Sequence, residues 1–448
     1  MRTEVRGSAD PWPVRMVGGK LPIMAAEQIR GWEFQDGAKD WRVLSTSGVG
    51  AWFATASHRD GAALVRRIVD ARAGDHVAGS MQPNVDLRGA GVQVWIPIPD
   101  TRRWAVADLA LAQDISAAAR ELALMPDPSV PQNMEWGIDT EDKATLSPFW
   151  QTLLGYEDTE YDDLLDPLRR DPRVWFYPAA PRPLRDRIHF DVAVPAEIAE
   201  ARVAAARRYG ARGGWSPGDG RALLTDAEGN EVDYIPAGGL GDGSQATDWR
   251  LPFGGMVFYP TRDFAQSANL ACTVAQVADE VGLPLMIDIR PAGIMIDTGK
   301  DQWEDERFGE TARRVQTAAR EEGLTADPSR LRFLQVCIDA VDVPSVREFW
   351  RVVLGYQNDQ REFVTDIYDP RRLNHPMIFQ QMDRNDTARR EQRNRIHLDL
   401  YLPDDQVAAR KQAALAASGR YTRGDAGTIA DPEGNEVDIG KAIADPPA

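Results

Sequence analysis

The sequence is short of cysteine, of positive charge and of long hydrophobic runs. Its 448 residues include only two cysteines, Cys272 and Cys337, too few for a disulfide framework or a thiol-rich metal site and typical of a reducing, cytoplasmic setting. The 52 lysines and arginines stand against 69 acidic residues, which gives a formal net charge of -17. This charge repels phosphate backbones and anionic membrane surfaces, so we expect no binding to nucleic acid or membrane. There is no run of about 18 apolar residues that could span a bilayer, and the polar start of the chain lacks the apolar core of a signal peptide.

What the sequence does contain is an internal duplication. Residues 112–156 recur as residues 312–356 without a gap. The matched residues include Arg120, Glu121, Asp127, Phe149, Trp150 and Gly155, which correspond to Arg320, Glu321, Asp327, Phe349, Trp350 and Gly355. Weaker matches extend upstream and downstream, so the repeat is about half of the chain. A unit of this length is too long for a solenoid repeat and long enough for two domains.

The first segment of the first repeat, residues 21–128, shows the order helix, strands, helix, strand, helix, and residues 246–328 resemble it more faintly. Residues 92–98 alternate as a half-buried strand, and residues 106–122 have helical spacing. Together with Gly31-Trp32, Trp52-Phe53 and the Asp-Leu-Ala-Leu-Ala of residues 108–112, this order resembles the pterin-4a-carbinolamine dehydratase fold. The His-His-Pro element on which that family's chemistry depends is replaced by Gln-Pro-Asn at residues 82–84 and by Leu-Pro-Leu at residues 283–285. These side chains are not proton donors near neutral pH, so we expect the fold without the dehydratase activity.

The second segment of each repeat reads as strand, helix and three strands, twice over. Three motifs of the first copy follow one another: Phe149-Trp150 leading to Leu-Gly-Tyr, Ile188-His189-Phe190-Asp191, and a hairpin of sequence Asp-Ala-Glu-Gly-Asn-Glu-Val-Asp at residues 226–233. This combination resembles the vicinal oxygen chelate superfamily, which contains the glyoxalase and bleomycin-resistance proteins.

We therefore predict an α+β chain of two repeats, in which each dehydratase-like α/β domain is followed by a vicinal oxygen chelate domain of paired βαβββ modules. The dehydratase-like domains are expected at residues 21–128 and 246–328, and the vicinal oxygen chelate domains at residues 129–238 and 329–442.

The resemblance to the vicinal oxygen chelate superfamily implies a groove with inward-facing metal ligands. By position, these are Glu135, His189 and Asp233 in the first copy and Gln335, His397 and Asp438 in the second. One imidazole with one or two oxygen ligands suits a divalent ion such as Zn, Ni, Mn or Fe. The two histidines and two aspartates are also the candidate catalytic residues, as ligands or as general acids and bases. The alternative is a groove without metal, in which the strand histidine only makes hydrogen bonds.

Two charged pairs, Asp86 with Arg88 and Asp288 with Arg290, occupy the same place in both copies and are candidate substrate-binding residues. Trp95 is a further candidate, because an indole can stack on a flat heterocycle. Structural ion pairs and a core tryptophan are the alternative reading. His375 lies in a polar stretch and is expected to be solvated.

These residues predict a small-molecule lyase, isomerase or dehydratase that acts on an oxygenated or heterocyclic metabolite. The alternative is a non-catalytic protein that binds and sequesters a small molecule, as the bleomycin-resistance proteins do. In a third possibility, one repeat has lost its chemistry and only packs against the other. We expect a monomer or homodimer, since a duplication can supply within one chain what a dimer supplies elsewhere.

Overall fold

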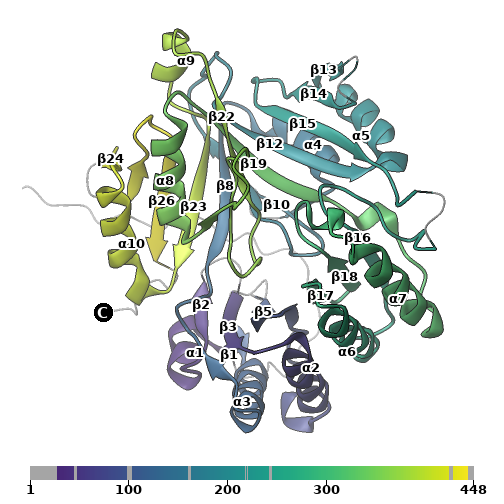
Figure 1. Ribbon diagram of the computed structural model, residues 1–448. Helices are drawn as coiled ribbons and strands as arrows, with labels where there is room; N and C mark the ends of the chain where they lie inside the picture. The colour runs from purple at the N-terminus through teal and green to yellow at the C-terminus, as the bar shows by residue number, and fades with distance from the viewer. Residues whose placement is uncertain are drawn as a thin grey trace, which may run out of the picture.

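The structure is a computed structural model (Figure 1) that describes residues 28–44, 48–97, 103–159, 163–216, 218, 220–241, 245–422 and 427–441. The predicted domain limits at residues 21 and 442 lie outside these ranges. Within them, no helix combines the length and apolar character that a membrane crossing requires.

The first segments of the two repeats share one sheet, which we call the joint sheet. The elements of the first repeat are β1 (Gln28–Ile29), α1 (Gly31–Gly37), β2 (Arg42–Leu44), β3 (Gly48–Ala54), α2 (His58–Arg72), β4 (Asn84–Arg88), β5 (Gly91–Pro97), β6 (Trp104–Ala105), α3 (Val106–Glu121) and β7 (Met125–Pro126). Those of the second are β16 (Met256–Pro260), α6 (Phe264–Val281), β17 (Met286–Arg290), β18 (Gly293–Asp297) and α7 (Phe308–Glu321). The strand order is β16-β18-β17-β4-β5-β3-β2, with β7 paired to β3.

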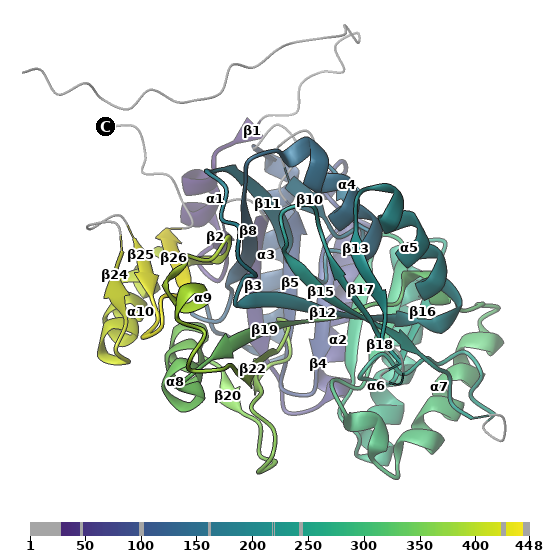
Figure 2. The same cartoon turned by 90° about the horizontal axis from the view of Figure 1, so that it is seen from above.

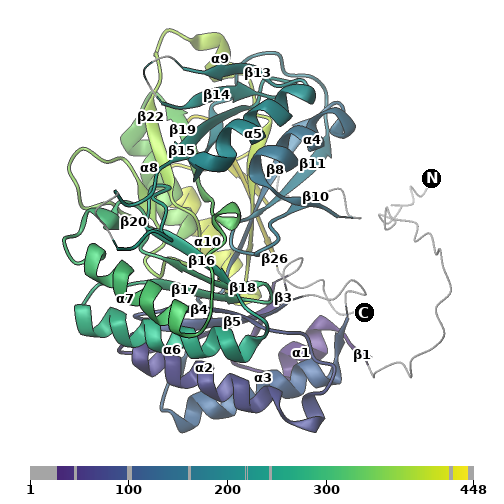
Figure 3. The same ribbon diagram turned by 90° about the vertical axis from the view of Figure 1, so that its right-hand side faces the viewer.

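The two repeats meet in the middle of the joint sheet. Strand β4 runs antiparallel to β17, with Asp86 opposite Asp288. Helices α2, α3, α6 and α7 cover one face of this sheet, and the other face looks toward the rest of the molecule (Figure 3). Apolar side chains of both repeats form one continuous core between the sheet and these helices. The two first segments therefore bury their hydrophobic surface together rather than as separate domains.

The second segment of each repeat forms two βαβββ modules, as predicted. Modules A1 and B1 come from the first repeat, and modules A2 and B2 from the second. A1 consists of β8 (Asn133–Thr140), α4 (Lys143–Leu154), β9 (Glu157–Asp158), β10 (Asp163–Leu165) and β11 (Arg173–Pro178). B1 consists of β12 (Ile188–Pro195), α5 (Ala196–Arg208), β13 (Arg212–Trp215), β14 (Ala222–Thr225) and β15 (Glu231–Ala237). A2 consists of β19 (Phe333–Ala340), α8 (Val343–Leu354), β20 (Gln357–Asn358), β21 (Ile367–Tyr368) and β22 (Met377–Gln381), and is followed by α9 (Thr387–Glu391). B2 consists of β23 (Ile396–Leu402), α10 (Asp404–Ala416), β24 (Arg420–Tyr421), β25 (Thr428–Ala430) and β26 (Glu436–Lys441).

The modules pair across the repeats and not within them. One sheet has the order β24-β25-β26-β23-β8-β11-β10-β9, which joins B2 to A1, and the other has β13-β14-β15-β12-β19-β22-β21-β20, which joins B1 to A2. Figure 2 shows β12 lying beside β19 of the other repeat, and the two strands are antiparallel. The prediction that each copy pairs its own two modules is therefore wrong. Within one chain, each A module therefore pairs with the B module of the other repeat, an arrangement that could also form between two subunits.

The hairpin motif of the B modules has a structural reason. Asp226 accepts hydrogen bonds from the Trp150 indole at 3.0 Å, from the Asn230 amide at 2.8 Å and from the backbone N–H groups of Glu228 and Asn230. Gly229 has φ +90°, which favours glycine over residues with a Cβ. Asp431, Trp350 and Asn435 repeat the arrangement in the second copy. The tryptophan and the hairpin thus tie the helix of an A module to a B module of the same repeat.

Replacing Asp226 with alanine is expected to lower the free energy of unfolding by about 2–4 kcal/mol, because several buried donors lose their acceptor. Replacing Asp431 with alanine should cost a similar amount. Pro432→Ala is the control, since Ala227 occupies that place in the first repeat. Urea denaturation monitored by tryptophan fluorescence would measure all three. Aspartate variants no less stable than the control would contradict the structural role of the motif.

Candidate functional site

Strand alternation places the histidine at the start of each B module, His189 or His397, on the face of its sheet opposite the helices. On β12, Ile188, Phe190 and Val192 belong to the apolar core, so His189 and Asp191 point to the other face. His397 and Asp399 occupy the same places on β23. Both strands are buried over nearly their whole length.

The strand register brings four side chains together around His189. Asp191 lies opposite Asp233 on β15 and opposite Gln335 on β19. The ligand atoms of His189, Asp191 and Asp233 all lie within 4.8 Å of one another. We call His189, Asp191, Asp233 and Gln335 the His189 site.

The same register around the other histidine defines the His397 site, which consists of His397, Asp399, Asp438 and Glu135. Asp399 lies opposite Asp438 on β26 and opposite Glu135 on β8. The grouping predicted from the sequence is therefore wrong in one respect. Glu135 belongs with His397 and Asp438, and Gln335 belongs with His189 and Asp233, because the A modules have changed partners.

Each acidic or amide side chain of the His189 site is held through one atom and leaves another free. Gln335 donates through Nε2 to Asp191 Oδ2 at 2.6 Å, and Arg221 donates to Asp233 Oδ2 at 2.9 Å. The remaining atoms are Gln335 Oε1, Asp191 Oδ1, Asp233 Oδ1 and His189 Nδ1, all buried and without a hydrogen-bond partner among the described residues. His189 Nε2 lies 3.8 Å from Asp191 Oδ1. Burial raises the pKa of Asp233, and the negative charge of Asp191 raises it further. Buried polar atoms without a hydrogen-bond partner are costly in a protein interior unless something binds them.

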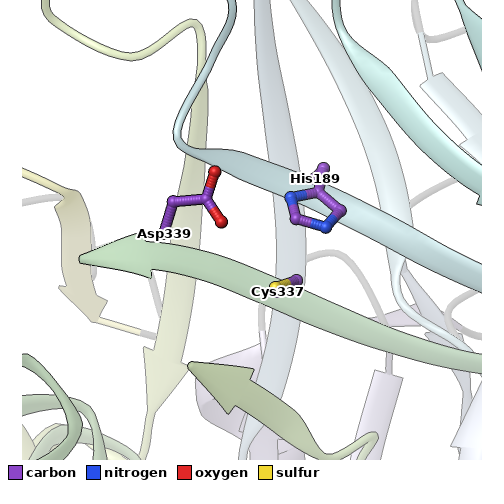
Figure 4. A group of neighbouring side chains, drawn as sticks. All are labelled: His189, Cys337 and Asp339. Carbon is purple, nitrogen blue, oxygen red and sulfur yellow. The ribbon is translucent and has the colours of Figure 1, made fainter. Parts of the chain in front are cut away.

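Cys337 and Asp339, both from β19, lie near His189 (Figure 4). Cys337 is opposite His189 in the β12–β19 register, and the ligand atoms of His189, Cys337 and Asp339 lie within 4.8 Å of one another. Burial raises the pKa of the Cys337 thiol well above its usual value, and Asp191 and Asp339 raise it further. The thiol is therefore protonated and is a poor nucleophile. Asp339 already accepts a hydrogen bond from Arg389.

The His397 site has the same frame but different surroundings. Tyr177 donates through its hydroxyl to Asp399 Oδ2 at 2.8 Å, and its ring lies against the His397 imidazole with a centroid distance of 5.3 Å. Both carboxylate oxygens of Glu135 accept hydrogen bonds, from Asn133 and from the Trp175 indole. Burial raises the pKa of Asp399 to about 6. His397 Nδ1 and Asp438 Oδ1 are buried and unpartnered within the described ranges.

Gly137 takes the place that Cys337 has in the other site. A Cβ at Gly137 would lie 2.5 Å from the His397 ring, so the imidazole fills the space that a side chain would need. The two sites thus have related ligands and different neighbours.

Both sets of residues fit a divalent cation, because they combine one imidazole with several oxygen donors. The fit is better at the His189 site, where all four side chains keep a free ligand atom. At the His397 site the hydrogen bonds to Glu135 leave that carboxylate less available. The sequence predicted His189, Asp233, Gln335, His397, Asp438 and Glu135 but missed Asp191, Asp399 and Cys337. The first two could have been found, since they lie two residues after each histidine and so share its face of the strand.

The predicted substrate-binding residues lie elsewhere, on the joint sheet. Arg88 pairs with Asp288 at 2.7 Å, and Arg290 pairs with Asp86 at 2.5 Å, so each arginine binds the aspartate of the other repeat. All four side chains are buried. Asp86 and Trp95 line a cavity of about 110 Å³, and Arg88 and Asp288 line a neighbouring one of about 70 Å³. No residue of the His189 or His397 site lines either cavity.

Comparison with known protein families finds a match to the modules of both repeats. The family described as the glyoxalase-like domain matches residues 135–235 and residues 335–440. The chain contains two glyoxalase-like domains. Each match begins within the first strand of an A module and ends within the last strand of the following B module, so each glyoxalase-like domain contributes one module to each sheet.

Solved structures with some similarity include glyoxalase I from Zea mays, with 10% identity, a TM-score of 0.34 and coverage of 69% of this chain and 92% of that chain. A mutant form of the same enzyme has 11% identity, a TM-score of 0.35 and coverage of 69% and 94%. These scores are too low to support an argument. No curated protein matches the chain. The resemblance of the remaining segments to the pterin dehydratase fold stays a prediction.

Proposed function

We propose that this protein is a small-molecule lyase or isomerase that holds a divalent cation at the His189 site and acts there on an oxygenated metabolite. The observation that supports this proposal is that ligand atoms of His189, Asp191 and Asp233 lie within 4.8 Å of one another, with Gln335 opposite Asp191. Each of the four side chains also has one buried polar atom without a partner among the described residues. A cation would satisfy these atoms and would offset the two negative charges of the aspartates. The two glyoxalase-like domains are consistent with a small-molecule site.

The residues around the site have separable roles. The hydrogen bond from Gln335 Nε2 to Asp191 fixes the amide so that its oxygen is the free ligand atom. Arg221 fixes the orientation of Asp233 in the same way. Supporting contacts of this kind hold ligand atoms in place and often change metal affinity 10–100-fold when they are removed. A bound divalent cation would act as a Lewis acid that polarises a substrate oxygen. Cys337 limits the space beside His189 and, as a neutral thiol, provides no competing nucleophile.

Measurements of metal binding can distinguish the His189 site from the His397 site. We expect the protein to bind one divalent cation tightly, and a second more weakly at the His397 site because Glu135 is already engaged. His189→Ala should abolish the tight site, and His397→Ala should leave it intact. The measurements are isothermal titration with Zn²⁺, Ni²⁺ and Mn²⁺ and elemental analysis after dialysis.

His76→Ala is the matched control, since this histidine is exposed and lies outside both sites. Arg221→Ala tests the support of Asp233 and should weaken the tight site by about tenfold or more. Equal cation affinity in the wild type and in His189→Ala would remove the proposed metal site.

A second candidate function, the sequestration of a small molecule without a metal, is favoured by the aromatic surroundings of the His397 site. Trp175, Tyr177 and Tyr401 lie on the same face of their strands as His397 and Glu135. Aromatic side chains of this kind supply apolar surface and hydrogen-bonding groups together. If none of the three cations binds to the wild-type protein, this function becomes the better explanation.

A further inference from the structure

The His189 and His397 sites differ at the residue that lies opposite the histidine in the strand pairing. Cys337 on β19 lies opposite His189, and Gly137 on β8 lies opposite His397. A Cβ at Gly137 would lie 2.5 Å from the His397 ring, so at that site the imidazole occupies the space of a side chain. At the other site a thiol side chain stands at this position. The His189 imidazole therefore has a sulfur atom beside it where His397 has a glycine.

Cys337 and His189 form a buried group with Asp339, which lies two residues further along β19. One ligand atom from each of these three side chains lies within 4.8 Å of the other two. The exposed fraction is 0% for Cys337, 2% for His189 and 5% for Asp339. His189 Nδ1 is buried and has no hydrogen-bond partner among the described residues. A buried nitrogen without a partner destabilises the fold unless something binds it.

The carboxylate of Asp339 is held through one of its two oxygens. Arg389 donates to Oδ2, and a nitrogen of Arg185 lies 3.7 Å from the same atom. No hydrogen bond from the described residues reaches Oδ1. Contacts of this kind orient a carboxylate and can keep its other oxygen available to a metal ion. The negative charges of Asp191 and Asp339 also act on the Cys337 sulfur, so the local field favours a cation.

We propose that His189, Cys337 and Asp339 form a further cation position, the Cys337 position, which takes a soft divalent ion such as Zn²⁺ or Cd²⁺. Thiolate and imidazole are ligands that such ions prefer, whereas the carboxylate and amide oxygens of the His189 site suit harder ions such as Mn²⁺. On binding, the cation replaces the thiol proton, which is released to solvent. The Cys337 position shares His189 with the site of the proposed function but does not rest on that function, because its other two ligands are different.

The shared histidine makes the two positions mutually exclusive. In a neutral imidazole one nitrogen carries a hydrogen and only the other can accept, so the ring can bind a single cation. A soft ion at the Cys337 position therefore withdraws His189 from Asp191 and Asp233. Occupation by one class of ion excludes the other.

The test uses the full-length protein with the substitution His397→Ala, so that the His397 site does not contribute, and takes Cd²⁺ and Mn²⁺ as probes. Cd²⁺ bound to a thiolate absorbs in the ultraviolet by charge transfer, and free Mn²⁺ is measured by electron paramagnetic resonance. We expect a single Cd²⁺ per chain to give this absorption and to weaken Mn²⁺ binding by about tenfold or more. The further substitution Cys337→Ser should remove the absorption and weaken Cd²⁺ by about tenfold or more, while the Mn²⁺ affinity stays unchanged.

Cys272→Ser is the matched control, because Cys272 is the other cysteine of the chain and is also buried. It should leave the absorption unchanged. Cys337→Gly introduces the residue of the first repeat and serves as a second variant if the serine disturbs folding.

The proposal is overturned if Cd²⁺ produces no thiolate absorption in the protein that keeps Cys337, or if the absorption persists in both Cys337 variants. Simultaneous binding of Cd²⁺ and Mn²⁺ around His189 would also overturn it. Thiolate absorption with Cd²⁺ but no binding of Mn²⁺ would support the Cys337 position and count against the oxygen ligands of the proposed function. The two proposals can therefore fail separately.

Discussion

Replacing Arg290 with methionine is expected to lower the free energy of unfolding by about 3–5 kcal/mol, which is the usual cost of leaving one buried charge without its partner. Asp86 is buried on β4, and Arg290 is its only ion-pair partner among the described residues. Methionine has a similar length but cannot neutralise the carboxylate. Arg290 also donates to the backbone oxygens of Leu168 and Val85, so the substitution loosens the contact between the joint sheet and the A1 module.

The matched control is Arg88→Met, at the equivalent position of the first repeat. Arg88 also makes a buried pair and donates to backbone oxygens, but Asp288 would still be bound to Arg170. Although burial raises the pKa of Asp288, Arg88, Arg170 and Arg290 together lower it below its usual value. We therefore expect Arg88→Met to cost less than Arg290→Met by about 1–3 kcal/mol. Urea denaturation followed by circular dichroism would measure both variants. A cost for Arg88→Met equal to or above that for Arg290→Met would show that Arg170 does not compensate.

The sequence predicts the modules well because their signals are local. The alternation of apolar residues on β12 and β23 identifies the buried face, and the Asp-x-Glu-Gly-Asn hairpin needs a glycine with positive φ. The internal duplication is visible in the sequence alone. These features correctly predict four βαβββ modules and the positions of His189 and His397 within them.

The partners of the modules could not be predicted in the same way. Alternation shows which face of a strand is buried but not which strand lies beside it, and the first strands of the A and B modules have similar patterns in both repeats. The pairing of β12 with β19, and not with β8, is therefore a property of the whole chain. For this reason the sequence groups Glu135 and Gln335 with the wrong histidines.

The same limit applies to the charged pairs. Their equivalent positions in both repeats indicate a common role, and the alternative of structural ion pairs agrees with the buried contacts of Arg88 and Arg290. The sequence could not show that each arginine binds the aspartate of the other repeat. This pairing between the repeats follows from the antiparallel arrangement of β4 and β17, which brings Asp86 opposite Asp288.

His375 is the clearest case in which the surroundings of a residue differ from the prediction. The sequence predicts a solvated side chain, but His375 is 8% exposed and accepts a hydrogen bond through Nε2 from the Trp136 indole at 3.1 Å. Its backbone oxygen accepts from Tyr356, as that of Pro172 accepts from Tyr156 in the first repeat. The hydrogen bond from the tyrosine to the backbone oxygen is thus present in both repeats, whereas only the second repeat has an imidazole at this position. Burial lowers the pKa of His375 to about 3, so the folded protein keeps this imidazole neutral in mild acid.

This shift makes the stability of the protein depend on pH in a defined direction. In the unfolded chain the His375 imidazole has a pKa of about 6.5 and takes up a proton below that pH, whereas in the folded protein it does so only near pH 3. Its contribution is therefore complete above pH 6.5 and is lost progressively as the pH falls toward 3. Between pH 7 and pH 5 the loss amounts to about 2 kcal/mol.

His375→Gln should remove this dependence while keeping an acceptor for Trp136. We expect the variant to be less stable than the wild type at pH 7.5 by about 1 kcal/mol, because some packing is lost. At pH 5 the difference should vanish or reverse, since only the wild type then binds an extra proton on unfolding. Urea denaturation at both pH values gives the two free energies for each protein. Other groups titrate equally in both proteins, so the change in their difference reports His375 alone. A stability difference that stays constant from pH 7.5 to pH 5 would mean that the imidazole is solvated in the folded state.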